Sequence, residues 1–159
     1  MVNFKKLLAA GLLMMMAQLM VAQVSNPFFE KLKGAKGAEM MEIGEELMTL
    51  ARMGVETPED KALMEHAKSM KVLNLDSANT PAVLKTAREE AAKIEKSGMT
   101  KLLSEQEDAQ EASIYILKKD NVIQEFFMWG YDNEDGFFAV QMNGTFTEDE
   151  LGGLMNMGK

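Results

Sequence analysis

The chain has 159 residues, of which 47% are hydrophobic and 26% are charged, and its formal net charge is -8. This length predicts one modest domain, the hydrophobic share argues against a wholly disordered chain, and the acidic charge disfavours nucleic acid as a partner. The sequence has no cysteine and one histidine, which excludes disulfides, thiolate zinc sites and metal sites built from several histidines.

The first 22 residues have the pattern of a secretory signal peptide. Lys5 and Lys6 precede an almost uninterrupted apolar run that ends at Ala22. Such a run is short for a membrane span, and its last residue is small, as at a cleavage site. We therefore expect residues 1–22 to be removed, with cleavage after Ala22 or one residue later, and the mature chain to be periplasmic or secreted. The alternative is an uncleaved amino-terminal anchor.

The expected mature chain, residues 23–159, is long enough to bury a core as a single domain. Losing two lysines takes its net charge to -10. Such a charge would suit a cationic peptide or a metal ion, but it is more often a matter of solubility, and it weakens attraction to anionic lipid surfaces.

The first half of this domain carries three helix start signals. Asn26-Pro27, Thr57-Pro58 and Thr80-Pro81 each pair an N-cap residue with a proline suited to the first helical turn. The third helix has an apolar stripe that ends before Gly98. The other elements predicted here are a strand over residues 38–43, a helix over residues 45–53 and a strand over residues 70–76.

The second half changes to a period of two, which predicts strands. Residues 132–136 read as a hairpin turn, because Asn, Asp and Gly are typical turn residues, and an EF-hand loop aligned on Gly136 would need acidic ligands where the chain has Tyr131 and Met142. Thr147 and Glu150 form a capping box that starts a last helix. The predicted strands cover residues 100–107, 112–117, 122–131 and 137–143, the third broken at Gly130, with a tight turn over residues 118–121. The fold class is therefore α+β, an antiparallel meander sheet of about five to six strands covered by helices.

Short motifs near both ends of the mature chain resemble those of a domain-of-unknown-function family of small exported proteins from Gram-negative bacteria. The motifs are Pro27–Leu32, Gly37-Ala38-Glu39, Gly144–Thr147, Glu150-Leu151 and Leu154-Met155. The resemblance covers residues 23–159 and implies no activity or catalytic residue. Met40 and Met41 depart from the family pattern, which leaves the pairing of the first strand open.

The sixteen methionines raise the possibility of copper binding. Thioethers bind Cu(I), and Met155 and Met157 have a close spacing, so a periplasmic metal or small-molecule carrier is one alternative function. Most methionines are nevertheless expected to fill gaps in the core. Those at predicted core positions are Met40, Met48, Met64, Met128 and Met142.

Acid–base chemistry has little support in the sequence. His66 has no evident orienting partner, so we expect it to be a surface or hydrogen-bonded histidine. Glu89 and Glu90 lie beside Arg88 and Lys93, as on a solvated helix face. An enzyme that uses a carboxylate pair is the second alternative, with no residue that can be assigned. The acidic pairs considered are Glu45/Glu46, Glu89/Glu90, Glu105/Glu107 and Glu148/Glu150.

The predicted strand Val122–Tyr131 carries large apolar side chains on both faces. One face should meet the helices, and Phe127, Trp129 and Tyr131 are then either covered or exposed. If they are exposed, they form a patch for a partner or an apolar ligand; cover is expected, because monomers seldom expose large apolar patches.

The sequence thus predicts an exported, non-catalytic protein that binds a protein or envelope partner. It assigns no catalytic, cofactor-binding or metal-ligating residue, no nucleic-acid partner and no membrane span in the mature form.

Overall fold

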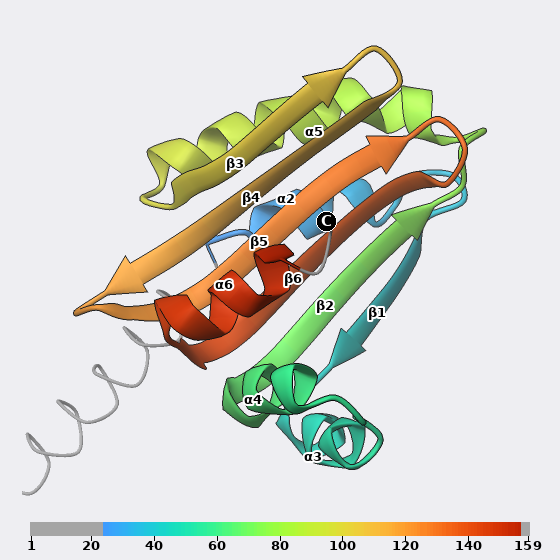
Figure 1. Cartoon of the computed structure of the whole chain (residues 1–159). Helices are drawn as coiled ribbons and strands as arrows, with labels where there is room; N and C mark the ends of the chain where they lie inside the picture. The colour runs from blue at the N-terminus through green and yellow to red at the C-terminus, as the bar shows by residue number, and fades with distance from the viewer. Residues whose placement is uncertain (1–23, 157–159) are drawn as a thin grey trace, which may run out of the picture.

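Six antiparallel strands form one sheet in the computed structural model, which describes residues 24–156 (Figure 1). The expected signal peptide, residues 1–22, lies outside the described residues. The elements in chain order are α2 (Asn26–Leu32), β1 (Glu39–Ile43), α3 (Glu45–Met53), α4 (Pro58–His66), β2 (Ala67–Leu75), α5 (Thr80–Lys96), β3 (Thr100–Glu107), β4 (Gln110–Lys119), β5 (Val122–Asp132), β6 (Gly136–Phe146) and α6 (Glu148–Asn156). The predicted α+β class is confirmed.

The strand order in the sheet is β1-β2-β6-β5-β4-β3. Strands β3 to β6 form the predicted meander, and β2 adds to the free side of β6. The open question about the first strand is answered by its pairing with β2, in which Glu39 lies opposite Asn74 and Ile43 opposite Met70. The amino-terminal strands therefore extend the meander into one continuous sheet.

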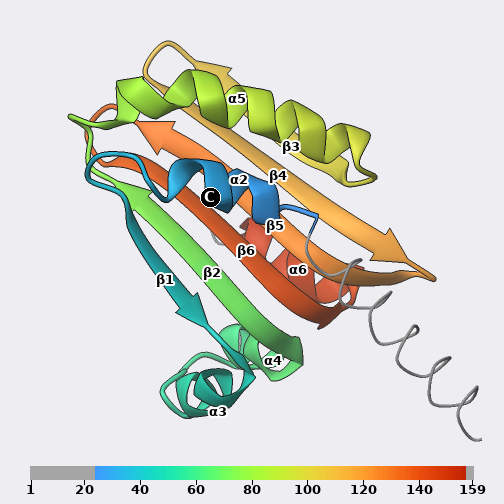
Figure 2. The same cartoon turned by 180° about the vertical axis from the view of Figure 1, so that it is seen from behind.

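Helices α2 and α5 lie across one face of the sheet (Figure 2). The predicted core side chains of α2, Phe28, Phe29 and Leu32, are buried there. The ring of Phe28 lies 4.8 Å from that of Phe127 and 6.1 Å from that of Trp129, centroid to centroid. The aromatic side of β5 is therefore covered, as expected, and α2 is the element that covers it.

A second, smaller core lies on the opposite face, where α6 packs (Figure 1). Leu151 of α6 belongs to the same buried cluster as Phe126 and Met142 of the sheet. Met48 of α3 and Leu63 of α4 complete this cluster at the end of the sheet. The sheet thus has apolar side chains on both faces, because helices meet both of them.

The predicted caps are only partly correct. Thr57 accepts the backbone N–H of Asp60 as predicted, and the capping box between Thr147 and Glu150 is present. However, α2 and α5 begin after Ser25 and Asn79, one residue earlier than predicted, and neither makes a side-chain cap. The reason at α2 is that the Ser25 hydroxyl donates to a glutamate in the sheet instead.

Gly130 does not break its strand, contrary to the sequence prediction. Strand β5 continues through it to Asp132. A side chain at this position would place Cβ only 2.6 Å from the carbonyl oxygen of Glu111 and 2.9 Å from the ring of Phe138. The glycine is therefore explained by close approach of its neighbours within a regular strand.

The turn predicted over residues 118–121 is narrower than expected. Asp120 and Asn121 alone form it, with φ values of 52° and 63°. Such left-handed pairs match the twist of a two-residue hairpin, so the flanking lysines remain in the ladder as part of β4.

Candidate functional site

The start of the described chain is fastened to a buried glutamate in the sheet. Glu125 of β5 is 0% exposed. Its carboxylate accepts the backbone N–H groups of Val24 (3.0 Å) and Ser25 (2.9 Å), the hydroxyl of Ser25, and the side-chain amide of Gln141 (2.9 Å). This cluster joins segments that lie 100 residues apart in the sequence.

Strand geometry explains why this polar group is buried. Side chains alternate between the faces of a strand, so Glu125 shares the helix-covered face with Phe127 and Trp129. The sequence reasoning did not single out Glu125. The signal that could have found it was a charged residue in phase with the aromatic side of a strand.

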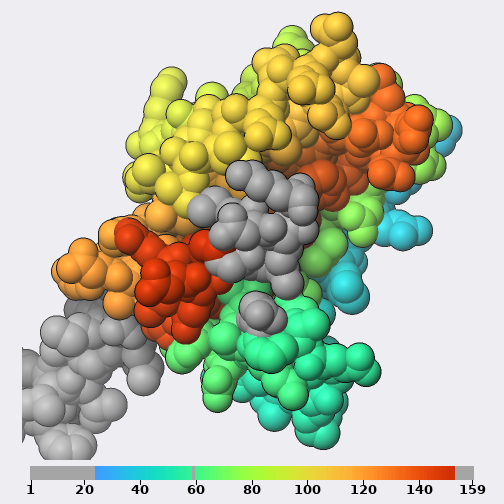
Figure 3. Space-filling view, in the orientation of Figure 1, coloured from blue at the N-terminus to red at the C-terminus, as the bar shows by residue number. Residues whose placement is uncertain are grey.

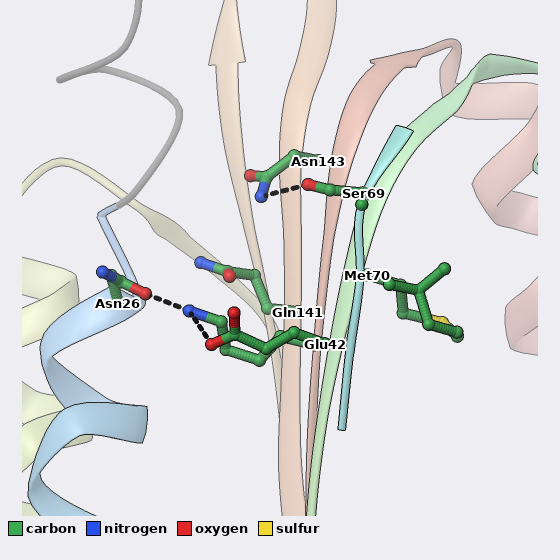
Figure 4. A pocket seen from close by; sticks show the side chains of 9 residues that line it. Asn26, Glu42, Ser69, Met70, Gln141 and Asn143 are labelled. Carbon is green, nitrogen blue, oxygen red and sulfur yellow. Dashed lines mark hydrogen bonds and ion pairs between the residues drawn. The ribbon is translucent and has the colours of Figure 1, made fainter. Parts of the chain in front are cut away.

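A small polar groove of about 160 Å³ adjoins this cluster, between the start of α2 and the sheet (Figure 4). The ammonium group of Lys71 lies in its wall. It donates to the side-chain oxygen of Asn26, lies 3.4 Å from a carboxylate oxygen of Glu42, and stands 5.6 Å from the ring centroid of Phe29. The charge of Lys71 is therefore already matched within the groove. The lining residues are Asn26, Glu42, Ile43, Gly44, Ser69, Met70, Lys71, Gln141 and Asn143.

One side-chain amide that lines this groove, that of Asn143, has only part of its hydrogen-bonding capacity satisfied. The side-chain amide nitrogen of Asn143 donates to the hydroxyl of Ser69 at 3.2 Å. Its oxygen, Oδ1, is buried and has no hydrogen-bond partner within residues 24–156. A buried acceptor without a partner is rare in native proteins and marks a place where a donor could bind.

Helix α3 presents a different kind of surface. Leu47, Leu50 and Met53 are 55%, 61% and 77% exposed, and their spacing of three residues places them along one side of the helix. The apolar spacing of this helix was predicted, but within α3 only Met48 is buried. The helix projects with α4 at one end of the molecule (Figure 3).

The position of α3 is fixed by its own arginine. The guanidinium group of Arg52 donates to the carbonyl oxygen of Met64 (2.8 Å) and to that of Ala67 (2.7 Å), which follows the end of α4. The apolar side of α3 is therefore held outward by bonds made on another side. The charged residues from β1 through α3 are Glu39, Glu42, Glu45, Glu46 and Arg52, so this region carries a net negative charge.

The residues considered for acid–base chemistry are dispersed. His66 lies at the surface, with its Nε2 atom 3.2 Å from a carboxylate oxygen of Glu150. Glu90 corrects an expectation, because its side chain is buried on α5 and bound by Lys93 at 2.6 Å and so does not lie on a solvated face. A hydrogen bond from Lys118 lowers the pKa of Glu148.

The predicted methionine packing is supported at five positions. Met48 and Met142 are buried, while Met40, Met64 and Met128 are partly buried against the two cores. Met157 and the side chain of Met155, which suggested copper binding, lie outside the described part of the chain. Within residues 24–156 no group of three or more acidic or histidine side chains is placed to hold a metal ion.

No helix in the described range has both the length and the apolar character that crossing a bilayer requires.

Comparison with known protein families gives a match over most of the domain. A family model described as a domain of unknown function, DUF4252, matches residues 29–154. Neither the curated proteins nor the solved structures that were searched contain a match to the chain.

Proposed function

Because the chain belongs to the DUF4252 family of domains of unknown function, we propose its role from its own surface: it is an exported, non-catalytic protein of the cell envelope that binds another protein through α3. The observation that carries this proposal is the exposed apolar side of α3, formed by Leu47, Leu50 and Met53. Amphipathic helices with anchors at such spacing are recognised by apolar grooves.

The charge around α3 determines the kind of partner. Glu45 and Glu46 lie in the first turn of the helix, and the single cation of α3, Arg52, is engaged with carbonyl groups of α4 and β2. An acidic rim favours a partner whose apolar groove is bordered by lysine and arginine, because complementary charge speeds association and fixes orientation. The same charge disfavours docking on anionic lipid.

The surroundings of Ser25 and His66, the two residues considered for nucleophilic and acid–base catalysis, support a non-catalytic role. The hydroxyl of Ser25 is fully buried and already donates to Glu125. His66 lies next to Glu150 at the surface, and no serine, threonine or lysine within residues 24–156 donates to its ring. A general base needs a proton donor within reach, and neither group offers that arrangement to a substrate.

The docking surface can be tested by site-specific photocrosslinking in cells. A photoreactive amino acid is placed at position 50 on α3, and a matched control is placed at Leu102, which is 42% exposed on β3 at the opposite edge of the sheet. We expect crosslinks to one exported partner from position 50 only. The purified partner should bind Leu50→Ser at least tenfold more weakly than wild type and bind Leu102→Ser normally, and its affinity should fall as salt rises.

Absence of crosslinks from position 50, equal crosslinking from position 102, or equal affinity of the partner for Leu50→Ser would each overturn docking through α3. Export is tested separately by mass spectrometry of the protein recovered from cell fractions. A chain that begins at Gln23 or Val24 in the periplasm or medium supports export. An intact amino terminus in the cytosol overturns it.

The groove beside Lys71 favours a second candidate, a carrier of a small polar molecule. The unpartnered oxygen of Asn143 would accept a hydrogen bond from such a ligand. Its test is a thermal-shift screen of small hydroxylated and amino compounds. Asn143→Leu should abolish any shift if this groove is the site, and an unchanged shift in that variant would place the ligand elsewhere.

A further inference from the structure

Glu125 is a buried carboxylate with no matching cation. None of the ion pairs formed within residues 24–156 includes it, although the buried Glu90 is paired with Lys93. Its four hydrogen bonds come from two backbone N–H groups, a hydroxyl and an amide. Removing a carboxylate from water is unfavourable, and hydrogen bonds from neutral donors offset this loss less fully than an opposite charge does.

The two backbone donors lie at the point where the mature chain is expected to begin. Cleavage after Ala22 makes Gln23 the first residue, and the α-amino nitrogen of that residue can lie no more than about 3.6 Å from the nitrogen of Val24. Val24 N is itself 3.0 Å from Oε2 of Glu125. If cleavage falls one residue later, the nitrogen that already donates to Glu125 becomes the α-ammonium group.

We propose that Glu125 is the receptor for the α-ammonium group that signal-peptide cleavage creates, and that this ion pair makes the processed chain more stable than its precursor. This inference rests on the proposed export of the protein. In the uncleaved chain the same nitrogen is a neutral amide, so the charge on Glu125 lacks this partner. Processing supplies the missing cation without any change in the side chains around it.

The pair has a defined structural role. Ser25 immediately precedes α2, and α2 carries the phenylalanines that cover the aromatic side of β5. An ion pair at Glu125 fastens the entry of α2 to that same strand. We therefore expect processing to stabilise the packing of α2 more than that of α3 or α6, because the hydrogen bonds of this cluster come from residues 24–25 and from β6.

The test compares purified chains that differ at the amino terminus. The reference chain starts at residue 23 and carries Gln23→Ala, because an amino-terminal glutamine can cyclise and lose its charge. The control carries two additional residues, Gly-Ser, before residue 23, which moves the ammonium group away by about 7 Å. Both chains are also made with Glu125→Gln, which keeps the shape of the side chain and removes its charge.

We expect the extension to lower the folding equilibrium constant at pH 7 about tenfold in the wild-type background and to have no effect in Glu125→Gln. Titration by NMR should place the α-ammonium pKa of the reference chain near 9 or higher, above the ordinary value of about 7.7–8.0. In denaturant the α-ammonium pKa of the same chain should return to its ordinary value. This comparison uses only the chain that keeps Glu125, so it remains decisive if the Glu125→Gln variant does not fold.

An ordinary pKa in the folded reference chain would overturn the proposal. So would an equal effect of the extension with and without the charge on Glu125. These measurements use purified chains, so their failure leaves the export proposal standing. Conversely, an unprocessed chain in cells would refute cleavage, and with it the proposed ion pair in the cell, even if the purified chains show the coupling.

Discussion

Replacing Phe28 by alanine is the most direct test of how α2 holds the sheet together. Phe28 is 0% exposed, and its ring lies within 6.3 Å of four other aromatic rings, measured between centroids. Truncating a buried phenylalanine removes its transfer free energy and leaves a cavity, which together lower the free energy of unfolding by about 3–5 kcal/mol. The rigid strands beneath α2 limit how far this cavity can collapse.

This loss can be expressed as a melting temperature. Unfolding entropy is about 2.1 cal/mol/K per residue, so a domain of about 130 residues loses about 1 °C for every 0.28 kcal/mol. The Phe28→Ala variant should therefore melt about 10–18 °C below wild type by differential scanning calorimetry. It should also bind a fluorescent apolar dye near the melting temperature of the variant, because the aromatic side of β5 loses part of its cover.

The matched control is Leu50→Ala on α3, where 61% of the residue is exposed. Its free energy of unfolding should differ from wild type by less than about 0.5 kcal/mol. If Phe28→Ala costs less than about 1 kcal/mol, or no more than this control, α2 does not cover the aromatic strand in solution.

Three further outcomes follow from the described contacts. Gly136→Ala should lower the free energy of unfolding by more than about 3 kcal/mol, because the added Cβ would lie 2.2 Å from a carbonyl oxygen of β2. The control Gly98→Ala has a similar positive φ but open space around it, so it should cost only the backbone strain of about 1–2 kcal/mol. Equal losses of the two variants in urea unfolding would contradict the clash. Arg52→Ala should lower the free energy of unfolding by about 1–3 kcal/mol. Arg52→Lys should restore only part of this loss, because one ammonium group cannot reproduce the guanidinium fork that binds two carbonyl oxygens. Full rescue by lysine would refute this geometry. The pKa of Glu148 is lowered in the folded state, so the stability gained from its pairing with Lys118 is fully present above the unfolded glutamate pKa of about 4.3 and is lost as the pH falls through the folded pKa. The melting-temperature difference between wild type and Lys118→Gln should therefore shrink from pH 7 to pH 3. A constant difference would contradict this pairing.

Local signals predicted most of the elements because their causes are local. The proline of the Thr57-Pro58 pair and the capping box at Thr147 act within one helical turn, and alternation along residues 137–143 reflects a single strand. The order in which β1 and β2 join the sheet was not predicted, since it depends on pairing between distant segments.

The candidate site was the least predictable part for the same reason. The donors to Glu125 come from the start of the described chain and from β6, so no window of sequence contains the cluster. Glu90 was misassigned because the charged residues beside it, Arg88, Glu89 and Lys93, are exposed, while its own side chain is buried together with Ala91. On α3, apolar residues occur on several sides, and the positions of α4 and of the sheet determine that Met48 is buried while Leu50 is exposed.

The place of β6 in the sheet has a consequence for how the protein is made. Although β6 is the last strand in the chain, it lies between β2 and β5, and Lys71 pairs with Gln141 across that junction. Until the final hairpin has been synthesised, β2 has an open edge of the kind that recruits strands from other chains. Ladders between such distant partners form slowly, so the nascent chain remains without a finished sheet until its carboxyl end is available. A premature stop before Gly136 therefore removes the strand that joins the two halves. The truncated product then has two unpaired edges, on β2 and β5, in addition to those on β1 and β3, and is prone to aggregate.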